Sequence, residues 1–165
     1  MFDDTFDNTP HHPILTEPEP TGFSTHEVEF HDGHRTDSYD FDGDGHVDLR
    51  TIDFDNDGRP EVTARDTDDD GRFDEIQYDW NENGTAESVA RDTDLDGRYD
   101  VAVTDQNENG IPELVVTDTD HDGRIDRWEY DRDDDGRIDD IYRDTDGDGR
   151  PDRHTTTHAR PRLFP

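Results

Sequence analysis

The chain of 165 residues contains no cysteine and no lysine, and only 25% of its residues are hydrophobic. The absence of cysteine excludes disulfide bonds and thiolate metal sites as sources of stability. No apolar run is long enough to cross a bilayer, so we expect no membrane span. Residues 1–4 show neither the basic nor the apolar region of a signal peptide, so we expect none in the sequence as written.

Charge of one sign dominates the composition. Aspartate and glutamate number 48 against 16 arginines, which gives a net charge of -32. Taken alone, such a composition is typical of a disordered chain, because it offers little apolar surface to bury. It is also consistent with adaptation to a high-salt cytoplasm. The high-salt explanation accounts for the charge but not for the constant spacing of the acidic residues.

The acidic residues gather in nine loops of the form D-x-[DN]-x-[DN]-G-x-x-[DE], spaced thirteen residues apart. We number the loops 1 to 9 in chain order and the residues of each repeat as positions 1 to 13. The loops begin at Asp40, Asp53, Asp66, Asp79, Asp92, Asp105, Asp118, Asp131 and Asp144. Oxygen-bearing side chains at alternate positions, followed by a glycine where the backbone turns, wrap a short loop around a hard cation. The pattern therefore predicts nine calcium sites.

Each predicted site uses side-chain oxygens at positions 1, 3 and 5, the backbone carbonyl at position 7 and the carboxylate at position 9. In loops 1 to 4 these residues are Asp40, Asp42, Asp44, His46 and Asp48; Asp53, Asp55, Asp57, Arg59 and Glu61; Asp66, Asp68, Asp70, Arg72 and Asp74; Asp79, Asn81, Asn83, Thr85 and Glu87. In loops 5 to 9 they are Asp92, Asp94, Asp96, Arg98 and Asp100; Asp105, Asn107, Asn109, Ile111 and Glu113; Asp118, Asp120, Asp122, Arg124 and Asp126; Asp131, Asp133, Asp135, Arg137 and Asp139; Asp144, Asp146, Asp148, Arg150 and Asp152. The arginine heads at position 7 are expected to screen neighbouring acidic loops.

The expected cofactor is calcium, at up to nine sites. Magnesium requires a small, strictly octahedral shell, which fits six or seven flexible protein oxygens poorly. Loops 4 and 6 carry asparagine at positions 3 and 5, so we expect them to bind more weakly or to depend on their neighbours. His31 and His34, which flank Asp32, offer a weaker transition-metal site, although exposed histidines are the commoner outcome.

Three regions follow from the spacing. Residues 1–39 are an irregular N-terminal arm with a candidate capping strand at 28–30, residues 40–152 are the repeat domain, and residues 153–165 are a basic C-terminal tail. Positions 10–13 are rich in β-branched residues and predict short strands, and no segment between loops has a helical pattern. Loops 3, 5, 7 and 9 share the sequence Asp-Thr-Asp, which indicates a structural unit of 26 residues.

The predicted fold class is all-β, with a calcium-stapled β-solenoid or roll as the leading architecture. Each 26-residue coil would contribute two strands and two loops, and stacking would align the apolar residues of position 11 into continuous columns. The alternative is an antiparallel β-meander in which each hairpin turn is a calcium loop. Both architectures preserve the thirteen-residue register, so the sequence leaves both open.

The loops resemble those of known calcium-binding families. An EF-hand is excluded, because position 12 is not consistently acidic and no helices flank the loops. The segments DFDGDGHVDL at 40–49 and DFDNDGRPEV at 53–62 resemble the loops of FG-GAP and VCBS-type repeats, which join strands. Thrombospondin type 3 repeats share the D-x-D-x-D-G core but rely on cysteines. RTX rolls are similar in geometry only, since their glycine-rich nonapeptide is absent.

These observations predict a calcium-dependent structural or adhesive module, secreted or at the cell surface, that folds on binding its ions. A protein or cell-surface partner and self-association through open sheet edges are expected, but no nucleic acid partner. The alternative is a cytoplasmic calcium buffer or sensor. An enzyme is not expected, because the chain has no cysteine, only three serines, and no recurrent pairing of histidine with carboxylates.

Overall fold

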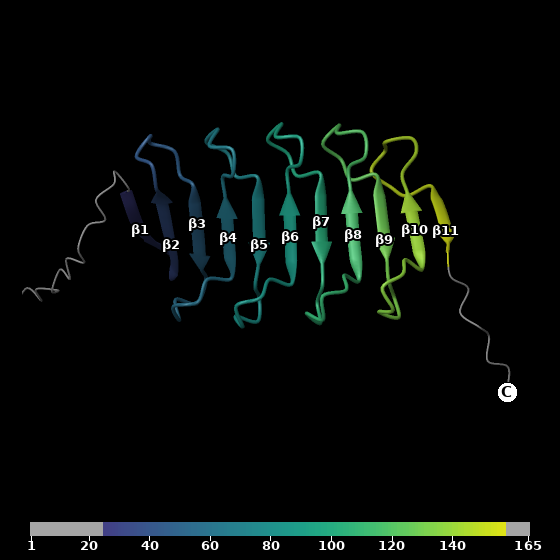
Figure 1. The fold of residues 1–165 in the computed structure, drawn as a ribbon, viewed down its shortest axis with the longest axis horizontal. Coiled ribbons are helices and arrows are strands. Elements are labelled where there is room, and N and C mark those ends of the chain that lie inside the picture. The colour runs from purple at the N-terminus through teal and green to yellow at the C-terminus, as the bar shows by residue number, and fades with distance from the viewer. Residues whose placement is uncertain (1–24, 158–165) are drawn as a thin grey trace, which may run out of the picture.

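The computed structural model describes residues 25–157, which form one open antiparallel sheet of 11 strands in sequence order (Figure 1). The strands are β1 Thr25–His31, β2 His34–Asp40, β3 Leu49–Asp53, β4 Val62–Arg65, β5 Glu75–Tyr78, β6 Ser88–Arg91, β7 Val101–Thr104, β8 Leu114–Thr117, β9 Arg127–Tyr130, β10 Asp140–Arg143 and β11 Arg153–Thr156. Residues 25–157 contain no helix, and hence none that could span a membrane. The predicted arm up to residue 24 and the tail from residue 158 lie outside the described residues.

The predicted strands at positions 10–13 are confirmed. From β4 onward each strand is four residues long and occupies these positions, as in β7 Val101–Thr104 and β8 Leu114–Thr117. The candidate capping strand at residues 28–30 lies within β1, which pairs with β2 around the turn at Asp32 and Gly33. Aspartate and glycine both accept the left-handed backbone that such a tight turn requires.

The expected solenoid is wrong, and the alternative meander is confirmed. Each strand pairs antiparallel with its neighbours in sequence, instead of with a strand one coil away. The reason is the way each loop closes. In loops 1, 3, 5, 7, 8 and 9 the amide at position 9 donates to the carbonyl of the residue that precedes the loop, as from Asp74 to Arg65 at 2.8 Å. The chain therefore leaves each loop beside the strand by which it entered.

The loops project alternately from the two ends of the strands (Figure 1). Loops 1, 3, 5, 7 and 9 lie at one end, which we call the odd end, and loops 2, 4, 6 and 8 lie at the other, the even end. The 26-residue period is therefore the spacing between neighbouring loops at the same end of the sheet, and not the length of a coil. The four Asp-Thr-Asp loops all lie at the odd end.

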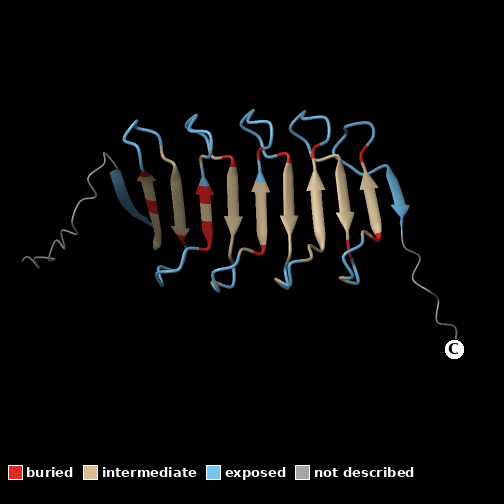
Figure 2. Cartoon of the chain, viewed as in Figure 1, coloured by how far each residue is buried: buried red, intermediate tan, exposed pale blue. Residues whose placement is uncertain are grey.

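The predicted apolar columns of position 11 are also wrong, because antiparallel pairing sets position 11 opposite position 12. Ala64 faces Ile76, and Val116 faces Trp128. Position 11 therefore alternates between the two faces of the sheet from strand to strand. Only Val62 and Ala64 are buried hydrophobic residues among those described. Buried residues gather instead where strands meet loops (Figure 2).

Candidate metal centres

All nine loops share one set of hydrogen bonds. The glycine amide at position 6 donates to Oδ2 of the position-1 aspartate over 2.7–3.0 Å. The amide at position 2 donates to the carboxylate at position 9 over 2.5–3.1 Å. These two bonds orient the carboxylates at the beginning and end of each loop.

The structure brings the predicted side-chain ligands of a loop together. In loop 1, oxygens of Asp40, Asp42 and Asp48 lie within 4.8 Å of one another. In loop 2 the same holds for Asp53, Asp55 and Asp57. Carboxylates at this spacing can share one cation with oxygen ligands. The ligand role of the carbonyl at position 7 stays a prediction.

Two positions in every loop have a left-handed backbone. Position 6 is glycine with φ between 81° and 98°, which explains its presence in all nine copies. Position 4 also has positive φ, although it is glycine only in loops 1 and 9. The seven other residues at position 4 are Asn56, Asp69, Glu82, Leu95, Glu108, His121 and Asp134, with φ between 56° and 65°. A left-handed non-glycine residue costs roughly 1–2 kcal/mol, so the loops hold position 4 against strain.

The most buried polar side chains are the predicted ligands. Eleven of the twelve buried polar residues occupy position 1 or position 9, and Asp100 and Asp118 are each only 2% exposed. Oδ1 of Asp118 is buried and has no hydrogen-bond partner. A buried carboxylate is costly unless a cation or sufficient hydrogen bonds compensate it. This distribution is the opposite of an ordinary core.

Electrostatics separate two kinds of carboxylate in the loops. Burial raises the pKa of Asp131, but amide donors led by Gly136 outweigh it and hold that pKa below its usual value. The pKa of Asp69 is raised, first by the charge of Asp42 in the neighbouring loop. The pKa of Glu82 is raised by desolvation and then by the charges of Asp57 and Asp55. Carboxylates between loops thus repel one another and favour a cation.

Arginines at position 7 link neighbouring loops at the same end. Arg72 donates from Nη1 to the carbonyl of Asp96 over 3.1 Å, and Arg98 donates to the carbonyl of Asp122 over 2.8 Å. Arg124 likewise reaches the carbonyl of Gly147 over 2.7 Å. The expected placement beside neighbouring loops is therefore observed for these arginines and for Arg59, which donates to the carbonyl of Glu82 over 3.3 Å. That they screen the acidic loops stays a prediction.

Position 4 makes a second contact between loops, which sequence reasoning missed. At each end of the sheet its side chain reaches back to positions 3, 5 or 9 of the preceding loop. The contacts are Asp69 with Asp42 and Asp44; Glu82 with Asp55 and Glu61; Glu108 with Asn81 and Asn83; His121 with Asp94 and Asp100; and Asp134 with Asn107 and Asn109. A separation of 27 residues between position 3 and the later position 4 is the signal that could have revealed them.

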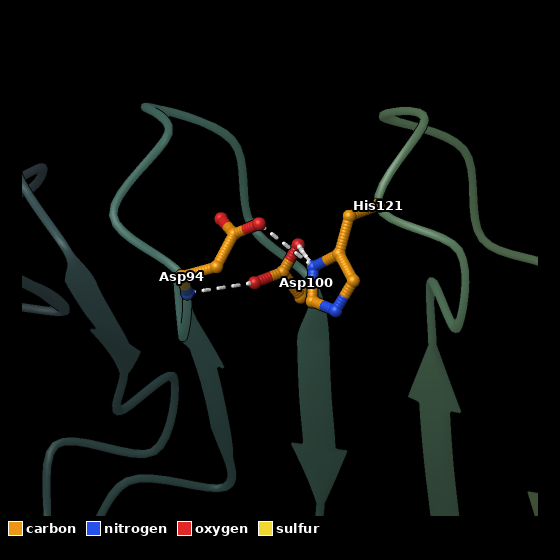
Figure 3. Close-up of side chains that lie close together, drawn as sticks. All are labelled: Asp94, Asp100 and His121. Carbon is orange, nitrogen blue, oxygen red and sulfur yellow. Dashed lines mark hydrogen bonds and ion pairs between the residues drawn. The ribbon is translucent and has the colours of Figure 1, made fainter.

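The contact in loop 5 includes a nitrogen donor. Nδ1 of His121 lies 3.1 Å from Oδ2 of Asp94 and 3.0 Å from Oδ1 of Asp100 (Figure 3). Hydrogen bonding to Asp100 raises the pKa of His121 above its usual value. His121 therefore bridges two carboxylates of loop 5 from loop 7, which lies 26 residues further along the chain. His31 and His34 form no comparable arrangement, since His31 lies 3.3 Å from exposed Asp32 while Nδ1 of His34 lies 2.7 Å from the carbonyl of Phe54.

Comparison with protein-family models, curated proteins and solved structures finds no match for this chain. The likeness to FG-GAP and VCBS-type loops accordingly stays a likeness of loop sequence. Function must be argued from the donors themselves. Their carboxylate and amide oxygens suit a hard divalent cation better than a thiophilic metal.

Proposed function

We propose that the loops bind calcium and that this binding folds the sheet. The observation that supports the proposal is the inverted burial: within residues 25–157, eleven acidic loop residues are buried but only two hydrophobic residues are. A single-layer sheet with so little apolar burial cannot offset the entropy lost on ordering its chain. Ions bound by the buried carboxylates supply the missing free energy, so that metal binding and folding are one process.

Calcium suits the loops better than magnesium. Each loop offers up to four carboxylates, and calcium accepts six to eight oxygen ligands in variable geometry. Magnesium keeps several water molecules and requires octahedral geometry. The net charge of -32 also falls as divalent ions bind, which reduces self-repulsion in the compact state.

The biological role that we propose is a structural or adhesive module outside the cell. Extracellular modules use calcium sites with dissociation constants of about 0.1–1 mM. A calcium sensor would need an apolar groove that opens on loading, whereas the chain has a single methionine and a sheet that pairs strand by strand. The edge strands β1 and β11 are exposed along their length, which supports the proposed self-association.

Equilibrium dialysis against calcium, with magnesium in excess, tests the proposal. The expected result is up to nine bound calcium ions per chain, with a dissociation constant near the millimolar range. The variant Asp118→Asn should bind one ion fewer, whereas Glu27→Gln, on exposed β1, should bind the same number as the wild type. Absence of calcium binding would refute the proposed function. Micromolar binding would instead support a buffer or sensor.

A further inference from the structure

We propose that position 4 supplies a ligand to the calcium site of the preceding loop at the same end of the sheet. This inference rests on the proposed calcium binding and adds a specific donor to four sites. The donors are Asp69 for loop 1, Glu82 for loop 2, Glu108 for loop 4 and Asp134 for loop 6. Each of these four sites is then shared between two loops that lie 26 residues apart in the sequence.

In loops 1 and 2, the carboxylate at position 4 of the next loop at the same end lies close to the predicted ligands. An oxygen of Asp69 lies within 4.8 Å of oxygens from Asp42 and Asp44. Glu82 makes the same approach to Asp55 and Glu61. Three carboxylates from two loops at this distance repel one another unless they share a cation. The left-handed backbone at position 4 also occurs at Leu95, whose amide donates to Asp92, so this conformation serves the loop itself. The side chains of Asp69 and Glu82 extend from it to the preceding loop at the same end.

Loops 4 and 6, which have asparagine at positions 3 and 5, also lie beside a position-4 carboxylate. Glu108 accepts hydrogen bonds from the amide groups of Asn81 and Asn83, the latter over 2.5 Å. Oδ2 of Asp134 accepts from Asn107 over 3.0 Å and from Asn109 over 2.5 Å. Position 4 therefore places a carboxylate beside both loops that have lost two of their own. Loops 4 and 6 need not be the weak sites that their own sequences predict.

An unpartnered oxygen points to a ligand in this arrangement. Oδ1 of Asp134 is buried and has no hydrogen-bond partner, although Oδ2 of the same group has two. Buried carboxylate oxygens are seldom left without a donor, and a bound cation would compensate this one.

The exceptions supply internal controls. Leu95 stands at position 4 beside loop 3 and Gly147 beside loop 7, so neither loop receives an oxygen from its neighbour. His121 brings nitrogen to loop 5, which a hard cation does not prefer. The even end is thus linked without interruption from loop 2 to loop 8, whereas the odd end is interrupted. Calcium should fill the even end cooperatively and most of the odd end independently.

Site-resolved NMR during a calcium titration tests the inference, because the glycine amide at position 6 reports on each loop separately. Asp134→Asn keeps a residue that tolerates positive φ but removes the donated charge. We expect it to raise the calcium midpoint at Gly110 of loop 6 by about tenfold, with a smaller change at Gly136 of its own loop.

A gain-of-function variant protects the test against a folding defect. Leu95→Asp should lower the calcium midpoint at Gly71 of loop 3 by about tenfold, whereas the matched control Leu95→Asn should leave it unchanged. The inference is overturned if all nine glycines respond to calcium but neither Asp134→Asn nor Leu95→Asp shifts the calcium midpoint of the preceding loop at the same end. If no glycine responds to calcium, the proposed function fails and the inference fails with it.

Discussion

The two ends of the sheet carry the same loop motif but hold neighbouring loops together in different ways. At the odd end, arginines at position 7 donate to the backbone of the next loop, as Arg72, Arg98 and Arg124 do. At the even end only Arg59 of loop 2 makes such a contact among the described residues, to the carbonyl of Glu82 over 3.3 Å. Position 7 of loops 4 and 6 is Thr85 or Ile111, and there the partly buried acids at position 4 make the contacts. Arginine contacts need no ion, whereas acid contacts require a cation or an amide partner.

The odd loops are also better satisfied internally. Four of them have threonine at position 2, whose hydroxyl donates to the position-9 carboxylate over 2.5–2.8 Å. The even loops have Phe54, Trp80, Gln106 or Arg132 at that position. The comparison teaches that one repeat can hold neighbouring loops in register with side-chain hydrogen bonds at one end and, under our proposal, with shared ions at the other. The even end should depend more steeply on calcium.

The largest effect is expected from removing a buried carboxylate at position 9. Glu87→Gln in loop 4 and Asp100→Asn in loop 5 should each lower the free energy of unfolding in calcium by about 3 kcal/mol, because the proposed ion would lose a buried carboxylate ligand. Removing the carboxylate of Glu87 should also destabilise loop 2, because Glu82 of the same loop contacts it. Removing the carboxylate of Asp100 should not destabilise loop 3. Urea unfolding with NMR of Gly58 and Gly71 measures both effects. Equal spreading at the two ends would contradict the comparison.

Glycine substitutions at position 6 give the next largest effect. Gly123→Ala should cost about 2 kcal/mol, because φ is +89° and the new Cβ would lie 2.5 Å from Nη1 of Arg98, displacing its hydrogen bond. Gly110→Ala has a φ of +88° but no neighbour within 4 Å, so it should cost only about 1 kcal/mol. Thermal unfolding in saturating calcium compares the two. The account of the odd end is wrong if both variants lose the same stability.

Replacing the two asparagines of loop 6 by aspartate should separate the contribution of a bound ion from that of the hydrogen bonds to Asp134. The double variant Asn107→Asp with Asn109→Asp exchanges two amides that face Asp134 for two carboxylates. We expect calcium affinity at loop 6 to rise about tenfold, while stability in chelator falls because like charges now meet. Calcium titration and chelated unfolding should therefore move in opposite directions. A variant that gains stability in both conditions would argue against a shared site.

The smallest effect concerns a carboxylate that we do not assign to any ion. Hydrogen bonds from Arg132 and His154 lower the pKa of Asp140 from 3.8 to about 2. Because the folded pKa is lowered, the contribution to stability is present above about pH 4 and is lost as pH falls toward 2. Asp140→Asn should destabilise slightly at pH 7, independently of calcium. A carbon-13 NMR titration that places the Asp140 pKa near 4 would contradict this assignment.

Much of each loop was predictable from the sequence, because its contacts are local. Gly45 bonds to Asp40 within one loop, and the fixed spacing of acids and glycine was enough to anticipate such a turn. The strands followed from runs such as residues 101–104. The choice between meander and solenoid did not follow from the sequence. It depends on how the backbone closes each loop, and the thirteen-residue spacing is compatible with both architectures.

The contacts of position 4 could not be read from one loop. Leu95 and Glu108 occupy the same position, so residue type alone shows no shared function. Whether a residue at position 4 can donate a ligand depends on which loop lies beside it. The order and pairing of the strands place loops that are 26 residues apart side by side. Long-range register, more than local propensity, decides which sites are shared.

The central claim is that ions fold this sheet. The most direct test is far-UV circular dichroism with sedimentation velocity on protein stripped with chelator and then titrated with calcium in excess magnesium. The account predicts an expanded coil in chelator that collapses to a compact, β-rich particle as calcium is added. A chelated protein that is already compact and β-rich, and that calcium leaves unchanged, would contradict it.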